Sequence, residues 1–156
     1  MKIMDFLSER AVTCHLDSQD KKGVIVELVS LLGRAGEIKE RDVSKLTEVL
    51  LNREALGSTG IGQGVAIPHG KTDCVNKLVA AFGISHGGVD FGSLDGESAH
   101  LFFLLVAPED SAGPHLKALA RISRLLKDKF FRDGLRQAKD EQTLLKILRD
   151  EDQRRH

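Results

Sequence analysis

The sequence predicts an α/β fold in which helices flank a mixed β-sheet. Helical patterns occupy the first and last thirds of the 156-residue chain, and strand patterns fill its middle. This grouping is typical of helices packed on a central sheet. Hairpin-type turns lie between the strand patterns, and they favour a mixed sheet over a purely parallel one.

Two amphipathic helices are expected before the middle of the chain. The first covers residues 21–34, where aliphatic residues recur at helical spacing. Asp17 and Ser18 are placed to cap its start, and Gly36 is placed to end it. The second covers residues 42–53. Its apolar face consists of Val43, Leu46 and Leu50.

Four strand patterns follow, and each is apolar and bounded by turn residues. The longest covers residues 99–107 and contains the most apolar run of the chain. Pro68 stops the first strand, which covers residues 65–67. The other strands are residues 78–85 and 89–91, and the turns are residues 86–88 and 94–97.

The last third of the chain is expected to be helical. Helices are predicted at residues 113–126, 130–137 and 141–149, and the charged residues 150–156 are expected to be frayed. There is no internal repeat and no low-complexity linker, so the length indicates a single domain over residues 1–156.

Composition excludes several classes of function. Lys and Arg total 23, as do Asp and Glu, so no net charge draws the chain toward nucleic acid or an anionic membrane. No window approaches the ~20 apolar residues of a membrane span, and the N-terminus lacks the apolar core of a signal peptide. Cys14 and Cys74 form no CxxC pair, which indicates reduced thiols. We therefore expect a cytoplasmic protein that neither inserts into a membrane nor binds nucleic acid.

The strongest candidate for chemistry is His69, within residues 64–71 (GVAIPHGK). It follows the end of a strand, where ligand sites form in α/β proteins. Pro68 stiffens the approach, and Gly70 lets another molecule come close to the imidazole. With an ordinary pKa near ~6.5, this imidazole is mostly neutral at pH 7 and is a good nucleophile toward phosphorus. The alternative is a loop histidine with no role.

Two further side chains are suited to binding a phosphoryl group. Arg53 offers a planar fork of donors that matches phosphate oxygens, although it is equally suited to a surface pair with Glu54 or Glu48. His115 follows Pro114 at a predicted helix start, where free N–H groups favour bound phosphate. The alternative for His115 is a histidine that caps the helix or packs against it.

The segment at residues 58–64 (STGIGQG) has the composition of an anion-binding loop. It is neither a Walker loop nor a GxGxxG motif, and a flexible connection is the alternative. His69 and His115 also raise the possibility of a metal-dependent hydrolase. Zinc sites need three or four protein ligands, and no HxxxH, HExxH or Cys/His cluster supplies the rest, so no metal is expected.

Together these motifs resemble the IIA domains of the bacterial phosphotransferase system (PTS), of the fructose/mannitol and nitrogen-regulatory types. Residues 53–62 (REALGSTGIG) and 65–71 (VAIPHGK) carry the resemblance, and the strand at 101–107 followed by His115-Leu116 also fits. The resemblance extends from about Asp5 to Leu148. It implies the fold of a PTS EIIA type-2 domain, a mannitol-specific EII-like sandwich with a mixed β-sheet flanked by helices.

The resemblance also implies the roles of these residues. His69 is the phosphoryl acceptor that forms a tele-phosphohistidine, although the residues themselves do not fix which imidazole nitrogen is phosphorylated. Arg53 and His115 are implied as the other catalytic residues of this phosphotransferase. No cofactor is expected. The phosphate-binding residues are expected to be Ser58, Thr59, Gly60 and Gly70.

The implied phosphoryl donor is an HPr-type phosphocarrier or its nitrogen-branch (NPr-type) relative. The N-terminal region, with Asp17-Ser18 ahead of Lys21-Lys22, is similar to that of nitrogen-regulatory members. These members act on targets such as sensor kinases and potassium transporters. Two alternatives stay open: a sugar-specific IIA that relays phosphate to a IIB domain, and a regulatory binding module that phosphorylation switches without onward transfer.

Overall fold

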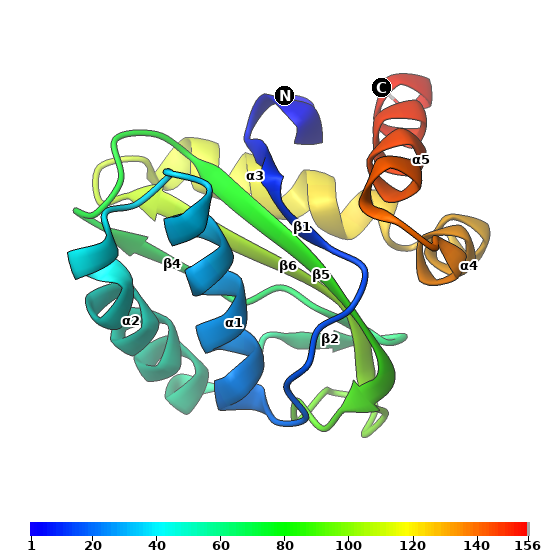
Figure 1. Ribbon diagram of the computed structural model, residues 1–156, viewed down its shortest axis with the longest axis horizontal. Coiled ribbons are helices and arrows are strands. Elements are labelled where there is room, and N and C mark those ends of the chain that lie inside the picture. The colour runs from blue at the N-terminus through cyan, green and yellow to red at the C-terminus, as the bar shows by residue number, and fades with distance from the viewer. Residues whose placement is uncertain (156) are drawn as a thin grey trace.

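A computed structural model describes residues 1–155 and contains a mixed six-stranded sheet at its centre (Figure 1). The strand order is β1-β5-β6-β3-β2, and β4 pairs with β6 beyond the end of β3. β5 and β6 are antiparallel, whereas β3 and β4 run parallel to β6. The mixed sheet predicted from the sequence is therefore confirmed. The strands are β1 (Leu7–Thr13), β2 (Gly60–Gly62), β3 (Val65–Ala66), β4 (His69–Thr72), β5 (Val79–Val89) and β6 (Ala99–Pro108).

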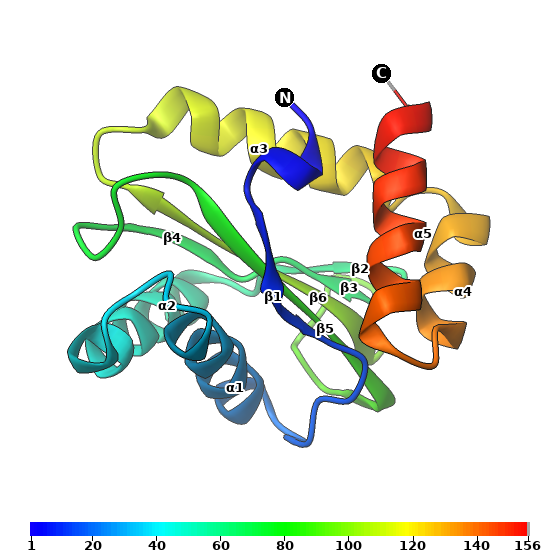
Figure 2. The same ribbon diagram turned by 45° about the horizontal axis from the view of Figure 1, so that its top comes forward.

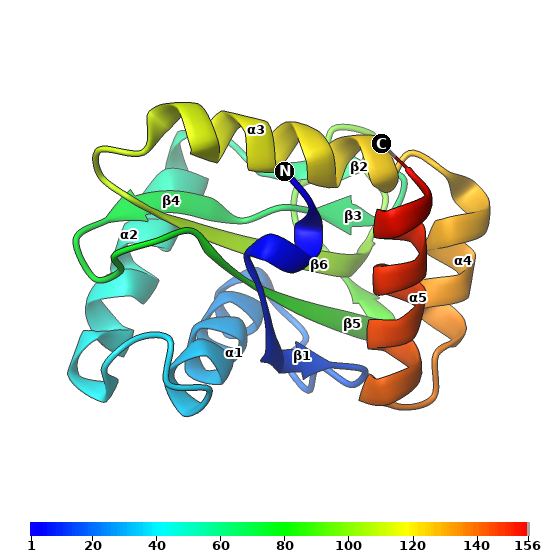
Figure 3. The ribbon, with the colours of Figure 1, turned by 90° about the horizontal axis from the view of Figure 1, so that it is seen from above.

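Helices cover both faces of the sheet (Figure 2). α1 and α2 pack on one face, and α3, α4 and α5 pack on the other (Figure 3). All five expected helices form, but α2 ends three residues later than expected and α5 five residues later. The helices are α1 (Lys21–Arg34), α2 (Val43–Leu56), α3 (Ala112–Leu125), α4 (Lys129–Gln137) and α5 (Glu141–Arg154), with short 3-10 helices at Ile3–Asp5 and Glu40–Asp42.

β6 runs through the middle of the core. Leu101, Phe103 and Leu105 pack on the side of α3 to α5, whereas Phe102 and Leu104 pack on the side of α1 and α2. A strand that is buried on both faces needs apolar residues at every position. This explains the uninterrupted apolar run in the sequence.

β5 has 11 residues and is longer than β6, which has 10 and was expected to be the longest strand. Residues 86–88, expected as a turn, are part of β5, and the pairing register shifts between Ile84 and Val89. Gly88 has a φ of +83°, which glycine adopts without strain, so it absorbs the irregularity inside the strand. Since Val89 belongs to β5, the separate edge strand expected at residues 89–91 is also wrong.

Two local features at the start of the chain differ from expectation. β1 was not predicted, because Glu9 and Arg10 interrupt its apolar residues; the strand lies at the sheet edge, where these side chains stay exposed. Asp20 caps α1, with its carboxylate accepting a backbone N–H of the first turn at 2.7 Å. The expected caps, Asp17 and Ser18, instead donate their backbone N–H groups to Glu27.

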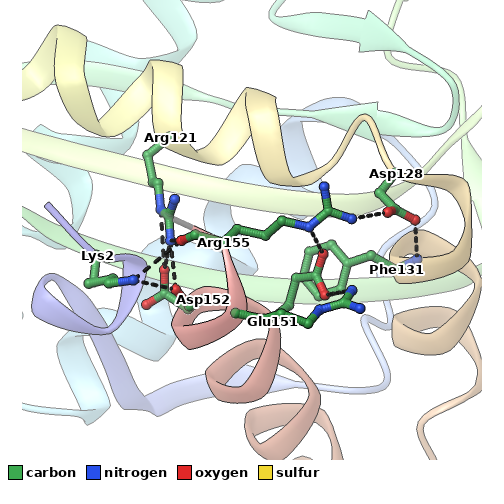
Figure 4. Close-up of polar contacts among 8 residues, drawn as sticks. Lys2, Arg121, Asp128, Phe131, Glu151, Asp152 and Arg155 are labelled. Carbon is green, nitrogen blue, oxygen red and sulfur yellow. Dashed lines mark hydrogen bonds and ion pairs between the residues drawn. The ribbon is translucent and has the colours of Figure 1, made fainter.

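The C-terminal segment is ordered rather than frayed. Asp152 is buried in α5, and its carboxylate accepts the N–H groups of Ile3 and Met4, both at 2.9 Å. The Arg121 guanidinium of α3 binds the same carboxylate at 2.8 Å (Figure 4). These bonds join the N-terminus, α3 and α5. The charge of Asp152 therefore fixes the C-terminal segment to the rest of the protein. The expectation of fraying covered residues 150–156, of which His156 lies outside the described residues.

Within residues 1–155, no helix has the length and apolar character needed to cross a lipid bilayer.

Candidate functional site

His69 lies at the start of β4, on the face of the sheet that α3 covers. Pro68 separates β3 from β4, so two short strands follow the same edge of β6. The half-buried imidazole has its Nδ1 2.7 Å from the carbonyl oxygen of Ile67. A carbonyl oxygen only accepts hydrogen bonds, so Nδ1 carries the proton of the neutral ring. The lone pair of neutral His69 is therefore on Nε2.

His115 faces His69 from the first turn of α3. The ring centroids are 5.4 Å apart, and the rings meet edge to face at 69°. Only 8% of His115 is exposed, and its Nε2 has no hydrogen-bond partner among the residues that the structure describes. A buried nitrogen without a partner is uncommon in folded proteins and indicates a place for a ligand or water. The two histidines thus form the centre of the site.

The surroundings keep both imidazoles neutral at pH 7. Burial is the main cause that lowers the pKa of His69; the Ile67 carbonyl opposes it, and the positive charge of Arg53 adds to it. Burial likewise lowers the pKa of His115, helped by the positive charge of His69 when that ring is protonated and by the charge of Lys71. Neutral rings offer nucleophilic lone pairs, which cationic rings lack.

Arg53 approaches the site from the last turn of α2. One of its guanidinium nitrogens donates to the Gly57 carbonyl at 2.8 Å, which ties the arginine to the loop that follows the helix. Its charge is close enough to affect the titration of His69. The structure therefore brings together His69, His115 and Arg53, the three residues that the sequence singled out for catalysis.

In the loop at residues 58–60, both hydroxyls and the N–H groups of Thr59 and Gly60 already have partners within the protein. The N–H and hydroxyl of Thr59 both donate to Glu54. The Gly60 N–H donates to the Ser58 hydroxyl oxygen at 2.9 Å, and that hydroxyl donates to the Phe91 carbonyl at 2.5 Å. In this arrangement these groups hold the loop in place.

Gly70 allows close packing of β4 on α2. A Cβ atom at this position would lie 3.3 Å from Val49 and 3.4 Å from Leu50. That contact is tighter than usual for carbon atoms, so a side chain would push the strand away from the helix. The glycine sets the position of His69 relative to Arg53 by this packing.

Glu54, expected from the sequence only as a surface partner of Arg53, is a buried residue of the site region. It is 7% exposed, and its carboxylate accepts Lys21 of α1 at 3.0 Å in addition to Thr59. The Lys21 ammonium also lies over the Phe91 ring at 4.7 Å. One signal was available: Leu46, Leu50 and Glu54 recur every four residues, which places Glu54 on the buried face of α2.

The two histidines are not part of a larger metal-binding cluster. Among residues 1–155, no group of three His, Cys, Asp or Glu side chains lies close enough to hold a metal ion. A zinc site uses at least three protein ligands, so the donor set at His69 and His115 does not fit one.

Comparisons with known proteins agree on one family. Residues 5–151 match the family described as phosphoenolpyruvate-dependent sugar phosphotransferase system, EIIA 2. The chain is 42% identical over 152 residues to the PTS system fructose-specific EIIABC component of Bacillus subtilis. The matched region is 97% of this chain but only 24% of that longer protein. It is 40% identical over 148 residues to a nitrogen regulatory protein of Bradyrhizobium diazoefficiens, with 95% of each covered. Among solved structures, it resembles the nitrogen regulatory protein IIA-Ntr of Neisseria meningitidis with a TM-score of 0.83 at 34% identity, covering 94% of this chain and 98% of that one.

Proposed function

The chain belongs to the EIIA 2 family of the phosphoenolpyruvate-dependent sugar phosphotransferase system, and from this premise we propose that it carries a phosphoryl group on Nε2 of His69. The IIA fold expected from the sequence is confirmed by the likeness to the Neisseria protein. Membership of this family supports phosphoryl transfer in general. We propose the histidine and its nitrogen from the geometry of the site, and we propose residues 1–156 as one IIA domain.

The observation that carries the proposal is the environment of the His69 ring. The protonated Nδ1 donates to the carbonyl oxygen of Ile67, 2.7 Å away, so the nucleophilic lone pair is on Nε2. The depressed pKa keeps that lone pair free at pH 7. The partnerless Nε2 of His115, with ring centroids 5.4 Å apart, offers a hydrogen bond to a group bound between the rings. A phosphoryl group on Nε2 would occupy that position.

The reaction proposed is an in-line transfer from a phosphohistidine of an HPr-type or NPr-type phosphocarrier. Nε2 of His69 forms a bond to phosphorus as the bond to the donor imidazole breaks, and the donor ring leaves with the bonding electron pair. Negative charge spreads over the three equatorial oxygens in the transition state. We propose that Arg53 and His115 bind those oxygens and that the N-terminus of α3 adds a favourable dipole.

Among the family's branches, we propose the nitrogen-regulatory one. In support, the chain and the Bradyrhizobium nitrogen regulatory protein match over 95% of each. The Neisseria protein of the same type matches over 98% of its length. Downstream partners in this branch would be regulatory targets such as sensor kinases and potassium transporters. A sugar-branch relay to a IIB domain is the second candidate, favoured by the 42% identity to the fructose-specific EIIABC component.

Intact-mass spectrometry at alkaline pH, where phosphohistidine survives, tests the proposal. The protein is incubated with phosphoenolpyruvate, enzyme I and either carrier type. We expect one added phosphoryl group on the wild type and on His86→Ala, an exposed histidine outside the site, but none on His69→Ala. Phosphate retained by His69→Ala would reject the assignment of His69. If neither carrier phosphorylates the wild type, the protein is not a phosphoryl carrier, and the alternative of a binding module without phosphoryl transfer replaces the proposal.

The branch is tested with the phosphorylated protein. A nitrogen-branch protein should accept phosphate faster from the NPr-type carrier than from the HPr-type carrier. It should also change its affinity for a target kinase on phosphorylation, because the group adds roughly two negative charges to a small surface. Rapid onward transfer to a fructose-type IIB domain would instead support the sugar branch.

A further inference from the structure

We propose that Lys71 is a further catalytic residue of this site, whose ammonium group binds the oxygens of the phosphoryl group on His69. The inference rests on the proposed function, because it concerns the same phosphohistidine. Three observations carry it, namely the register of β4, the packing of Gly70 and the absence of an ion-pair partner, together with the known charge of a phosphoryl group.

The strand register places Lys71 beside His69. β4 pairs with β6 in parallel, with His69 opposite Leu105 and Lys71 opposite Ala107. Leu105 belongs to the core cluster on the side of α3, so His69 is on that side too. Side chains alternate along a strand, and Lys71 follows His69 by two residues. Both side chains therefore share the face of the sheet that carries His115.

Gly70 supports the same orientation independently. A Cβ at Gly70 would meet Val49 of α2, so this residue faces the opposite layer of helices. Its partner in β6, Val106, belongs to the core cluster of α1 and α2. The residues on either side of Gly70 must then face α3. In agreement, the charge of Lys71 acts on His115.

Lys71 has an exposed side chain and no ion-pair or hydrogen-bond partner among residues 1–155. Other lysines of the same region are paired: Lys45 binds Asp73 at 2.6 Å, and Lys21 binds Glu54 at 3.0 Å. An unpaired ammonium group on a flexible stem can reach a phosphate without first breaking an ion pair. It binds phosphate as a point charge.

The negative charge of a phosphohistidine exceeds the positive charge that the predicted residues supply. A phosphoryl group carries roughly −1.5 to −2 charges at pH 7. Arg53 provides one positive charge, His115 is neutral, and the loop donors Thr59 N–H, Gly60 N–H and the two hydroxyls are uncharged and engaged within the protein. Lys71 supplies the second positive charge.

The test is the equilibrium constant for phosphoryl transfer from the phosphocarrier, measured for wild type, Lys71→Met and Lys71→Arg. A contact made only in the phosphorylated state shifts this equilibrium, whereas a lysine that merely docks an acidic carrier changes the forward and reverse rates equally. We expect Lys71→Met to lower the equilibrium constant about tenfold or more, as for loss of one charge-assisted contact, and Lys71→Arg to restore most of it. Lys77→Met is the control, since Lys77 is exposed and does not act on either histidine.

A second readout does not need phosphorylation. The pKa of His115, followed by NMR, should rise in Lys71→Met because a nearby positive charge is removed. An unchanged transfer equilibrium with slower rates in both directions would show a docking role and overturn the inference. If the wild type accepts phosphate and Lys71→Met has the same equilibrium constant, only the inference fails; if the wild type accepts none, the proposed function fails with it.

Discussion

The carboxylate of Glu54, on the last turn of α2, accepts both the backbone N–H and the hydroxyl of Thr59 in the loop that follows. It also pairs with Lys21 at 3.0 Å, so it connects α1, α2 and the loop. The neighbouring Arg53 holds the same loop through Gly57. A buried carboxylate therefore sets the geometry of the segment next to the two histidines, without contacting either ring itself.

Replacing this carboxylate should weaken both the fold and the reaction. Glu54→Ala leaves the buried Thr59 N–H and hydroxyl without acceptors, and we expect a loss of about 1–3 kcal/mol in the free energy of unfolding. Phosphoryl acceptance should slow as well, because the loop no longer fixes Arg53. Urea unfolding and carrier-dependent phosphorylation measure the two effects. Glu48→Ala, on the exposed face of the same helix, is the matched control, and equal effects in both variants would contradict the prediction.

Asp152 should be among the most important residues for stability. Its side chain is 1% exposed and binds Arg121, whose side chain is 7% exposed. Removing one partner of a buried pair leaves an uncompensated charge, so Asp152→Ala should cost about 3–5 kcal/mol of unfolding free energy. Asp150→Ala removes an exposed pair with Lys146 in the same helix and should cost about 1 kcal/mol or less. Similar unfolding midpoints for the two variants in urea would refute the difference.

The contribution of Asp152 should also depend on pH. Burial raises its pKa, but the bonds from Met4, Ile3 and Arg121 together outweigh burial and hold the pKa below its usual value. The folded state thus favours the charged form. The stabilisation is complete above the unfolded-state pKa of about 3.9 and is lost as the pH falls through the folded-state value. The difference in unfolding free energy between wild type and Asp152→Asn, measured in urea, should decrease below about pH 4. A difference that stays constant from pH 7 to pH 2 would disprove this pH dependence.

A candidate site can be proposed from sequence patterns where one segment carries the information. Residues 64–71 contain the Pro and Gly that shape the backbone around His69, so the motif can be recognised from the sequence alone. The contact between His69 and His115 joins positions 46 residues apart and depends on α3 packing on β6, the strand that pairs with β4. It was predicted only through the resemblance to a known family.

The features that were missed depend on partners that are distant in the sequence. Asp152 belongs to a charged segment with the composition of a frayed tail, and only its contacts with Ile3 and Arg121 explain its burial. Glu54 has the sequence context of a surface residue, and only its contacts with Thr59 and Lys21 explain its burial. A charged residue is buried only with its partners, and sequence patterns do not report those partners.

The reactivity of His69 should persist at lower pH than that of a free imidazole. Burial, opposed by the Ile67 carbonyl and aided by Arg53, lowers its pKa, so the ring stays neutral and nucleophilic as the pH falls. An imidazole with a pKa of about 6.5 would be only about one-quarter neutral at pH 6. We expect the rate of phosphoryl acceptance to fall by less than fourfold between pH 8 and pH 6, after correction for the carrier. NMR titration of the unphosphorylated protein measures the pKa of His69 directly. A value at or above the usual one would exclude a lowered pKa as the cause.

His115 and Arg53 should contribute mainly to the transition state. In the proposed mechanism each donates to the equatorial oxygens, and loss of one such donor typically lowers the rate by about 10²–10³. His115→Ala and Arg53→Ala should therefore fold normally but accept phosphate about 10²-fold or more slowly in rapid-quench experiments. Arg53→Lys should recover little, because an ammonium cannot supply the fork that binds both an oxygen and the Gly57 carbonyl. Arg41→Ala, an exposed arginine before α2, controls for loss of surface charge. Wild-type rates in either site variant would remove that residue from the mechanism, since a group that stabilises the transferred phosphoryl cannot be deleted without slowing the transfer.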